Sequence, residues 1–410
     1  MLKMAITQQW REPGKKTFSV TIGGDFCPRE ENSRYVAEHA ADIVKEIKPF
    51  FKKESLNILQ WECAVTEGGT PIVKRGPNLR CGEPVLDVLT ELGIDVALLA
   101  NNHTGDFGPS EIGTTEQAIR RRGILTVGTG KDIEDAAKPL FLEKNGVSIA
   151  ILNICENEFG GARKGKAGTN TLDVLTNIEQ IKAAKQQADV VLVLLHGGHE
   201  TNPYPSPRMV KTFRAFAGAG ASVVWNCHTH CPEGFEVRNG VPVIYSPGNF
   251  YFPGSPTMRK TWWTGYVTEF LCDEKGCYGF ELTPYGFTKE GMFPLTGETL
   301  AAAEKYLLDL CKVLDDPDEL QSLFDSWCTG AGIGYLSTVA ATEEKPWPPA
   351  DWKDKDVHNR WIGVRNLFTC ESHANLLNNT CRLIEEFRVD EAKAGYDRIA
   401  KQMDPGFVTW

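Results

Sequence analysis

The sequence predicts an α/β fold that is followed by a mainly helical C-terminal part. Short apolar runs with the composition of buried strands alternate with segments of helical spacing up to about residue 250. This alternation is typical of a chain that builds β-sheet and covers it with helices. From residue 295 onward, helical spacing dominates to the end of the chain.

The length of 410 residues allows one large α/β domain with an appendage, or two domains. We expect an N-terminal extension at residues 1–16, a principal domain at residues 17–294 and a helical appendage at residues 295–410. A hydrophobic content of 41% and a charged content of 24% are ordinary for a globular protein.

The first half of the α/β part is expected to contain short strands separated by helices. Residues 17–22 are mostly apolar or β-branched and stop at two glycines, which is typical of a strand and the turn that ends it. Residues 32–51 place Ile43, Ile47 and Phe50 on one face of a helix. The other strands are expected at residues 56–59, 95–99 and 124–127, and the other helices at residues 84–92 and 110–122.

The second half is expected to contain two hairpins around a buried strand. Residues 139–155 and 235–245 each turn at an Asn-Gly pair, which is a strong hairpin signal. Residues 190–195 form a continuous apolar run, as in a strand that is buried on both faces. Further helices are expected at residues 171–187 and 207–217, and further strands at residues 222–225, 266–272 and 278–282.

The C-terminal part is expected to be helical around one irregular loop. Its helices are expected at residues 299–314, 317–327, 367–387 and 389–403. The loop is the Pro- and Trp-rich stretch at residues 343–361. Its Trp347, Trp352 and Trp361 either cover a pocket as a lid or pack the appendage on the core, and packing is the favoured interpretation.

Charge and cysteine pattern limit the class of protein. The net charge of −10 argues against a nucleic-acid surface, because phosphate binding depends on Lys and Arg. An ordinary membrane span is excluded, since no run of about 18 apolar residues occurs. We see no apolar signal-peptide core at the N-terminus, and the twelve cysteines lack the compact spacing of a disulfide framework. We therefore expect reduced thiols in a cytoplasmic protein.

Polar residues with metal-binding side chains follow several of the expected strands. Carboxyl ends of strands are where open α/β sheets place their sites, so these residues are expected to meet. A two-metal site needs a bridging carboxylate, further oxygen or nitrogen ligands, and open positions for substrate. The candidates are the carboxylates of Asp25 and Glu62, with Glu62 as the bridge, the amide oxygen of Asn102, and the imidazoles of His196, His228 and His230.

His103 directly follows Asn102 and is the candidate catalytic residue. It would project near the substrate without necessarily touching a metal, which suits a general acid or a transition-state stabiliser. Four neighbouring residues are additional candidates for the site or for its supporting contacts, although solvent exposure is equally plausible for the last two. They are Cys27, Asn101, His199 and Glu200.

Each residue taken alone also has a structural interpretation. Asp25 after a glycine suits a turn, Asn102 suits a helix cap, and His196 at a strand end suits a core histidine. His228 and His230 are harder to explain by packing, because they stand in one tight loop. The agreement of all these segments favours metal binding. A weaker signal, the glycine-containing residues 128–131, lacks the spacing of a phosphate-binding loop and is interpreted as a turn; His39, His358 and His373 are expected to be structural.

With these motifs the chain resembles the CapA/PgsA family, the poly-γ-glutamate capsule synthesis proteins of the calcineurin-like metallophosphoesterase superfamily. The resemblance extends from about residue 17 to residue 255. It implies a four-layer α/β/β/α sandwich with metals at the edge loops of the sheets. The residues that carry it are Gly24 and Asp25, Glu62, residues 99–103 with Asp106 and Gly108, residues 127–130 with Pro139, residues 196–198 with Glu200, residues 228–230 and residues 245–250.

The resemblance also implies a ligand for each metal position. One divalent metal would take Asp25, Glu62 and His230, and the other would take Glu62 with Asn102, His196 and His228, while His103 matches the catalytic histidine of the superfamily. One or two ions of Mn, Fe, Zn or Mg would fit such ligands. Cys27 stands where the wider superfamily has a histidine, so the first metal lacks a ligand unless the Cys27 thiolate replaces it.

Three functions follow from this interpretation. The first is a metal-dependent hydrolase of the phosphoesterase type, linked to poly-γ-glutamate or capsule biosynthesis. The second is a non-catalytic accessory protein that binds a ligand during poly-γ-glutamate or cell-envelope assembly. The third is metal-assisted acid/base chemistry on a peptide. In each case we expect a small anionic or peptide-like substrate, and a role in capsule assembly would require a partner from the membrane-bound machinery.

Overall fold

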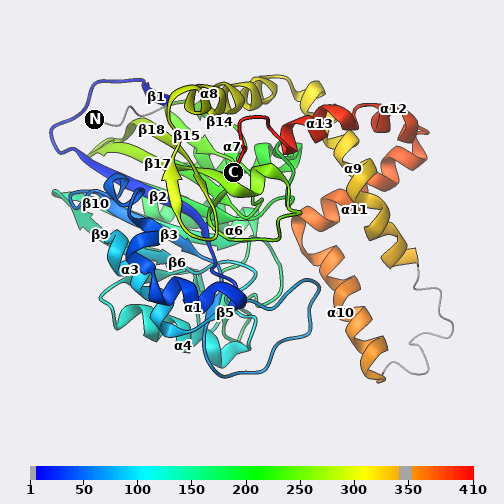
Figure 1. The fold of residues 1–410 in the computed structure, drawn as a ribbon, viewed down its shortest axis with the longest axis horizontal. Coiled ribbons are helices and arrows are strands. Elements are labelled where there is room, and N and C mark those ends of the chain that lie inside the picture. Colours follow the sequence, from blue (N-terminus) through cyan, green and yellow to red (C-terminus); the bar gives the residue numbers. More distant parts are fainter. Residues whose placement is uncertain (1–5, 341–352) are drawn as a thin grey trace.

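Two β-sheets lie face to face at the centre of the molecule (Figure 1). The computed structural model describes residues 6–340 and 353–410. The strands of the larger sheet are β1 (Ile6–Gln9), β2 (Phe18–Phe26), β3 (Leu56–Trp61), β6 (Val96–Leu98), β7 (Leu125–Val127), β16 (Asn249–Tyr251), β17 (Thr264–Asp273), β18 (Gly276–Phe287) and β19 (Met292–Pro294). Their order is β1-β18-β17-β2-β3-β6-β7, with β16 beside β2 and β19 beside β18.

The strands β2, β3, β6 and β7 are parallel, so their carboxyl ends lie at one edge of this sheet. The strands β17 and β18 form a long antiparallel pair beside β2. The chain's expected N-terminal extension is partly incorporated into the sheet, because β1 pairs with β18 from Ile6 to Gln9.

The smaller sheet contains the buried strand and both hairpins expected from the sequence. Its strands are β9 (Leu140–Lys144), β10 (Val147–Cys155), β12 (Val190–His196), β13 (Val223–Cys227), β14 (Phe235–Arg238) and β15 (Val241–Ile244), in the order β14-β15-β13-β12-β10-β9. Asn145, Gly146, Asn239 and Gly240 all have positive φ, as tight hairpin turns require. The strand β12 is buried along its whole length, which explains its unbroken apolar sequence.

The two faces of the larger sheet pack against different layers. In β3, Ile58 belongs to the core between the sheets, whereas its neighbour Leu59 belongs to the core beneath the outer helices. The same alternation occurs in β6, because successive strand residues point to opposite faces. The helices α1 (Glu30–Glu38), α2 (Ala40–Val44), α3 (Asp87–Leu92) and α4 (Pro109–Arg120) share the outer core of this sheet, while α6 (Val174–Lys185) and α7 (Pro207–Ala219) pack on the smaller sheet. The predicted α/β/β/α sandwich is confirmed.

The helix expected at residues 32–51 is interrupted, which corrects the prediction. It consists of α1, α2 and a 3₁₀ turn at Lys48–Phe50. The ring nitrogen Nδ1 of His39 bonds the carbonyl oxygen of Tyr35 at 2.9 Å at the first break, and such side-chain bonds compete with helical ones. Pro49 lies within the 3₁₀ turn that follows the second break and cannot donate a helical hydrogen bond.

The loop expected at residues 343–361 is also corrected, because its last part is helical. The C-terminal helices are α8 (Gly297–Cys311), α9 (Pro317–Ala340), α10 (Lys355–Thr369), α11 (Glu371–Glu385), α12 (Val389–Ala394) and α13 (Tyr396–Met403). Asp354 starts α10 by accepting hydrogen bonds from the backbone of Asp356 and Val357, so Trp361 lies within a helix. Trp347 and Trp352 lie outside the described residues.

The C-terminal helices pack beside the sandwich and upon one another (Figure 1). Leu310 of α8 and Phe324 of α9 belong to the same apolar core as the facing sheets. The expected turn at residues 128–131 is more ordered than predicted, since β8 (Thr129–Gly130) pairs with β11 (Gly168–Thr169). All twelve cysteines are free thiols. Within residues 6–340 and 353–410, none of the helices is both long and apolar enough to cross a bilayer.

Candidate metal centre

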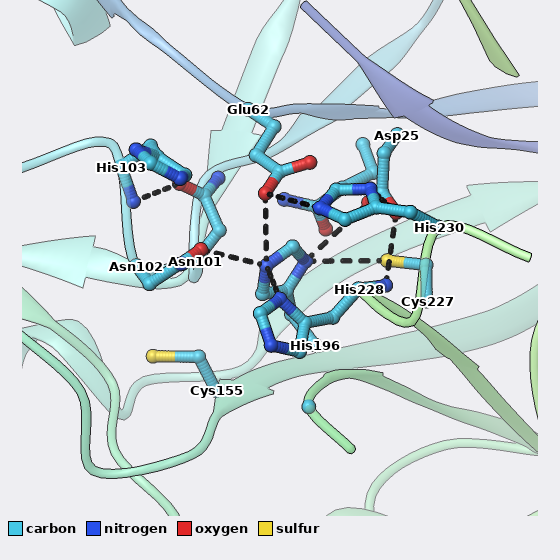
Figure 2. A network of polar contacts seen from close by, with 12 residues as sticks. Asp25, Glu62, Asn101, Asn102, His103, Cys155, His196, Cys227, His228 and His230 are labelled. Carbon is cyan, nitrogen blue, oxygen red and sulfur yellow. Dashed lines mark hydrogen bonds and ion pairs between the residues drawn. The ribbon is translucent and has the colours of Figure 1, made fainter. Parts of the chain in front are cut away.

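The six residues predicted to bind metal lie together where the carboxyl ends of the two sheets meet (Figure 2). They are Asp25 in β2, Glu62 after β3, Asn102 after β6, His196 at the end of β12, and His228 and His230 after β13. Parallel strands in each sheet bring these positions to the same end of the molecule. All six side chains are buried.

Gly24 permits the close approach of two strands beside the first carboxylate. A Cβ atom on Gly24 would lie 2.2 Å from the carbonyl oxygen of Gly248, a distance that backbone atoms cannot accept. Next to it, β2 shifts its register against β3 between Gly23 and Asp25. A bulge of this kind re-aims a side chain, and here the side chain is that of Asp25.

The loop after β13 holds two histidines in an unusual backbone conformation. His228 has a φ of 102° and His230 a φ of 55°, which is uncommon for residues other than glycine and is typical of functional sites. The backbone N–H of His228 donates to Asp25 Oδ2 at 2.9 Å. His230 Nδ1 donates to Asn249 Oδ1 at 2.8 Å, which leaves its Nε2 available as a ligand.

The first predicted ligand set comes together around the two carboxylates. Glu62 Oε1 lies 3.9 Å from His230 Nε2, and Asp25 Oδ2 lies 3.7 Å from His230 Nδ1. The same oxygen of Glu62 lies 3.4 Å from His196 Nε2, so Glu62 faces both histidines. This position suits the bridging role that the sequence predicts for it.

The second predicted set converges on one nitrogen of His196. His196 Nε2 lies 3.0 Å from Asn102 Oδ1 and 3.1 Å from His228 Nδ1. With Glu62 Oε1 at 3.4 Å, a carboxylate oxygen, an amide oxygen and a second imidazole nitrogen lie close to this atom. This mixture of oxygen and nitrogen donors suits the first-row divalent metals and zinc.

The carboxylate of Glu62 shows that these residues fit a bound cation. Glu62 is 0% exposed, and among the described residues neither of its oxygens has a hydrogen-bond partner. A buried carboxylate that accepts no hydrogen bond is costly, and besides its contacts with His196 and His230 a bound metal would compensate its charge. Asp25 Oδ1 likewise accepts no hydrogen bond from the described residues, and His196 Nδ1 lies 3.4 Å from it.

The pKa values of the histidines reflect the same excess of negative charge. Burial disfavours a charged imidazole at His196, but Glu62 and Asp25 outweigh burial and raise its pKa to about 9. At His228, burial lowers the pKa well below its ordinary value, and the neighbouring His196 and His230 add to this effect. The carboxylates thus attract positive charge to His196, and a divalent cation would compete with that proton.

His103 lies beside the cluster and is held by a buried ion pair. His103 Nδ1 lies 2.7 Å from Asp106 Oδ2, and Lys74 Nζ donates to Asp106 Oδ1 at 2.6 Å. The Lys74 side chain is only 3% exposed and that of Asp106 is fully buried. Burial raises the pKa of Asp106, but His103 and Lys74 reverse the effect and hold it below its ordinary value. Asp106 is therefore a carboxylate that fixes the ring of His103.

Cys27 is not among the grouped donor residues of the candidate centre, and Asn101 makes hydrogen bonds elsewhere. Cys27 is fully buried beside Cys63, and burial raises the pKa of its thiol. Asn101 Oδ1 accepts hydrogen bonds from the backbone of His103 and Thr104, and its amide nitrogen donates to a backbone carbonyl. The structure therefore gives Asn101 the role of shaping the loop that presents Asn102 and His103.

His199 and Glu200 lie on the wall of the adjoining pocket. His199 Nε2 bonds the carbonyl oxygen of Ser372 at 3.0 Å, and burial lowers its pKa to about 3, with a further contribution from Arg208. His199 is therefore a neutral side chain that touches the C-terminal helices. Glu200 is exposed.

The sequence did not predict a role in the site for three residues that the structure places there. One donor atom each from Cys227, Asp25 and His196 lie within 4.8 Å of one another. Asn249 orients His230, and Lys74 pairs with Asp106. The position of Cys227 directly before His228 was a usable signal, whereas Lys74 stands in an irregular loop without any distinguishing pattern.

A pocket of about 400 Å³ adjoins the candidate metal centre. Residues from the sandwich and from the C-terminal helices share its wall. The sandwich contributes Asn102, His103 and His228, and the helices contribute Trp327, Tyr335 and His373. The site is therefore completed by a part of the chain that lies far away in sequence.

The comparisons with known proteins agree with the motifs. The family described as bacterial capsule synthesis protein PGA_cap matches residues 19–254. The PGA biosynthesis protein CapA of Bacillus subtilis (strain 168) is 28% identical over 298 residues, which is 70% of this chain and 78% of that protein. The capsule biosynthesis protein CapA of Bacillus anthracis is 28% identical over 260 residues, 61% of this chain and 63% of that protein.

Solved structures of similar shape include a 5'-nucleotidase precursor from Thermus thermophilus. It has a TM-score of 0.40 and 11% identity, and the match covers 74% of this chain and 59% of that one. A hypothetical protein from the same organism has a TM-score of 0.41 and 15% identity, with 66% of this chain and 99% of that one covered. The family match alone spans more than half of the 410 residues, so this protein belongs to the PGA_cap family of bacterial capsule synthesis proteins.

Proposed function

We propose that this protein is a metal-dependent hydrolase of the phosphoesterase type that acts in poly-γ-glutamate or capsule biosynthesis. The observation that carries the proposal is the buried carboxylate of Glu62, which accepts no hydrogen bond from the described residues and faces His196 and His230 at one side of a pocket. The names of the two CapA relatives support the biosynthetic setting.

The chain's own residues would hold two cations. Asp25, Glu62 and His230 would bind one of them. The other would be bound by Glu62 together with Asn102, His196 and His228. Such cations, when bound, supply Lewis-acid stabilisation of the charge that develops on a reacting phosphoryl group.

His103 would supply the proton that the leaving oxygen needs. Because Asp106 bonds its Nδ1, the other ring nitrogen of His103 remains free to exchange a proton with a ligand in the pocket. Lys74 keeps Asp106 charged and in place, so it orients the histidine indirectly. General acid catalysis of this kind contributes about 10²–10⁴-fold in rate.

The pocket favours a small ligand that carries an anionic group. Lys74 and Arg75 lie on its wall beside His103, and Tyr335 offers an apolar ring. Glu158 and Glu200 lie on the same wall and would accept hydrogen bonds from a peptide-like or amine-bearing part of the ligand.

Turnover of phosphoesters by single-site variants tests the hydrolase proposal. We expect activity on a panel of aryl phosphomonoesters and phosphodiesters that depends on added Mn, Fe, Zn or Mg. Asn102→Ala and His103→Ala should each lower turnover by about 10²-fold or more. His39→Ala, a histidine outside the pocket, is the matched control. Equal turnover in the wild-type protein and both site variants would refute the proposal.

An accessory binding role is the second candidate, and the position of Cys27 favours it. This thiol is buried beside Cys63 and is not grouped with the donor atoms of the candidate centre, so the first metal position would lack that ligand. The role predicts saturable binding of poly-γ-glutamate oligomers, measured by titration calorimetry, without hydrolysis across the substrate panel. Metal-assisted acid/base chemistry on a peptide would instead exchange deuterium from solvent into a substrate Cα position.

A further inference from the structure

A second group of metal-binding side chains lies outside the candidate metal centre. Glu158 follows β10, Cys370 immediately precedes α11, and His373 lies in the first turn of that helix. One donor atom from each of the three lies within 4.8 Å of the other two. Cys370 is the N-cap residue of α11 and His373 stands three residues later, where the side chain of an N-cap residue reaches the first turn.

The orientation of His373 is fixed by Asn366. The amide nitrogen of Asn366 donates to Glu158 Oε2 at 2.7 Å, so its amide oxygen must be the atom that faces His373. His373 Nδ1 lies 2.9 Å from this oxygen and therefore carries the proton that it donates. The other nitrogen, Nε2, lies 3.5 Å from Glu158 Oε1 and is an acceptor when the ring is neutral. Two acceptors that face each other require a proton or a metal cation between them.

The surroundings of Cys370 also favour a cation. The buried thiol of Cys370 donates a hydrogen bond to Glu156 Oε2 at 3.5 Å, and the carboxylates of Glu158 and Glu371 add negative charge near it. Of these three carboxylates, Arg208 pairs with that of Glu156. Burial, reinforced by these carboxylates, raises the pKa of the Cys370 thiol, while the backbone N–H of His373 acts in the opposite direction by favouring the thiolate. A bound cation would stabilise the thiolate much more strongly than this one N–H group.

Glu158 and His373 of this second group face the pocket that adjoins the candidate metal centre. Glu158, Asn366 and His373 line this pocket together with Asn102 and His103. The side chains of Glu158 and His373 are 10% and 24% exposed, so a cation between them would be reached from the pocket.

We propose that Glu158, Cys370 and His373 form a further cation site, of the kind that binds zinc. Thiolate, imidazole and carboxylate are the three donors that zinc takes from proteins, and three protein ligands leave a fourth position for water or a ligand. The fourth position faces the pocket, where it is available to an anionic group of a bound ligand. Asn366 orients both Glu158 and His373, as the hydrogen-bonded partners of metal ligands usually do.

Zinc titration of the chelator-treated full-length protein tests this site. A chromogenic zinc indicator should report one ion more in the wild-type protein than in Cys370→Ser and His373→Ala. The variant His228→Ala/His230→Ala, which damages the other centre, should retain this ion. Asn366→Ala should weaken it by about tenfold or more. Equal zinc stoichiometry and affinity in the wild-type and the Cys370→Ser protein would overturn the proposal and leave an ion pair between Glu158 and a protonated His373.

Cobalt substitution supplies a readout that does not depend on loss of stability. A thiolate ligand to Co(II) gives a near-ultraviolet charge-transfer band. Since Cys227 lies near the other centre, both cysteines must be compared. The band should persist in Cys227→Ser and disappear in Cys370→Ser, with circular dichroism confirming that both variants fold. A band lost only in Cys227→Ser, or absent from the wild-type protein, would overturn the assignment.

Discussion

Asp106→Asn should impair stability and catalysis together, because this carboxylate has three partners. Its oxygens accept hydrogen bonds from Lys74 Nζ at 2.6 Å and from the backbone N–H of Leu79 at 2.7 Å, and they hold His103 Nδ1 at 2.7 Å. The Lys74 side chain is 3% exposed. The substitution would leave its ammonium group buried without a counter-charge.

The expected cost follows from this burial. Removing one partner of a buried ion pair costs about 3–5 kcal/mol. At about 2 °C per kcal/mol for a large domain, the melting temperature should fall by about 6–10 °C. Turnover should fall by about 10²–10⁴-fold, because an asparagine no longer holds the proton on His103 Nδ1. Differential scanning fluorimetry and initial rates on the best phosphoester substrate measure the two effects.

The double variant Lys74→Met/Asp106→Asn separates charge burial from catalysis. Removing the unpaired ammonium group should reverse at least half of the fall in melting temperature, because a buried site of this kind accepts an apolar side chain of similar size. It should restore none of the lost turnover, since His103 still lacks its carboxylate. The ion-pair reasoning would be refuted if Asp106→Asn had the melting temperature of the wild-type protein. It would also be refuted if Lys74→Met/Asp106→Asn were less stable than Asp106→Asn.

Four further predictions concern other parts of the molecule. Glu62→Gln removes the charge between the histidines, so elemental analysis should find at least one bound ion fewer per chain. Gly24→Ala places a Cβ atom 2.2 Å from the carbonyl oxygen of Gly248, so both the melting temperature and the metal content should fall. Glu156→Gln weakens the contacts of its carboxylate with Ser372, so amides in α11 should exchange hydrogen faster while those in β12 do not. Burial lowers the pKa of His199 to about 3, so the stability that its neutral ring provides is present above pH 6.5 and declines as the pH falls towards 3. The decline should not exceed about 1.4 kcal/mol per pH unit, and denaturant titrations from pH 7 to pH 5 should show a smaller slope in His199→Gln.

These predictions have clear contrary outcomes. Full metal content in the Glu62→Gln protein would remove this carboxylate from the ligand sets. Unchanged exchange in α11 of the Glu156→Gln protein would show that apolar packing alone holds the helix. A His199→Gln protein with the wild-type pH slope would mean that other groups account for the loss of stability in acid.

Much of the fold could be predicted because local patterns decide it. The alternation in β3 separates Ile58 from Leu59, and each residue packs in the core that its side of the sheet requires. The Asn-Gly pairs fix the two hairpin turns through their positive φ values. The prediction of one continuous helix at residues 32–51 was wrong, because the spacing of apolar residues does not reveal the competing hydrogen bond of His39.

The grouping of the candidate metal ligands could be predicted for a similar reason. Each candidate ligand lies in the last residues of an apolar strand or shortly after it, and parallel strands bring their carboxyl ends together. Beyond the end of a strand, side chains no longer alternate between two faces, so the sequence does not fix where each one points. Cys27 was therefore predicted as a possible ligand, whereas the structure places its thiol beside Cys63. Lys74 escaped prediction because it pairs with a residue 32 positions away across an irregular loop.

The C-terminal helices were predicted as an appendage, but their contacts connect them to the site. Ser372 bonds Glu156, and Glu371 bonds both the backbone and the side chain of Asn157, over separations of more than 200 residues. No local pattern encodes such pairs, because they form only after the sandwich and the helices have folded against each other. The family match ends at residue 254, while Tyr335 and His373 help to line the pocket. The residues shared with the family therefore provide the candidate chemistry, and residues outside the match shape what can approach it.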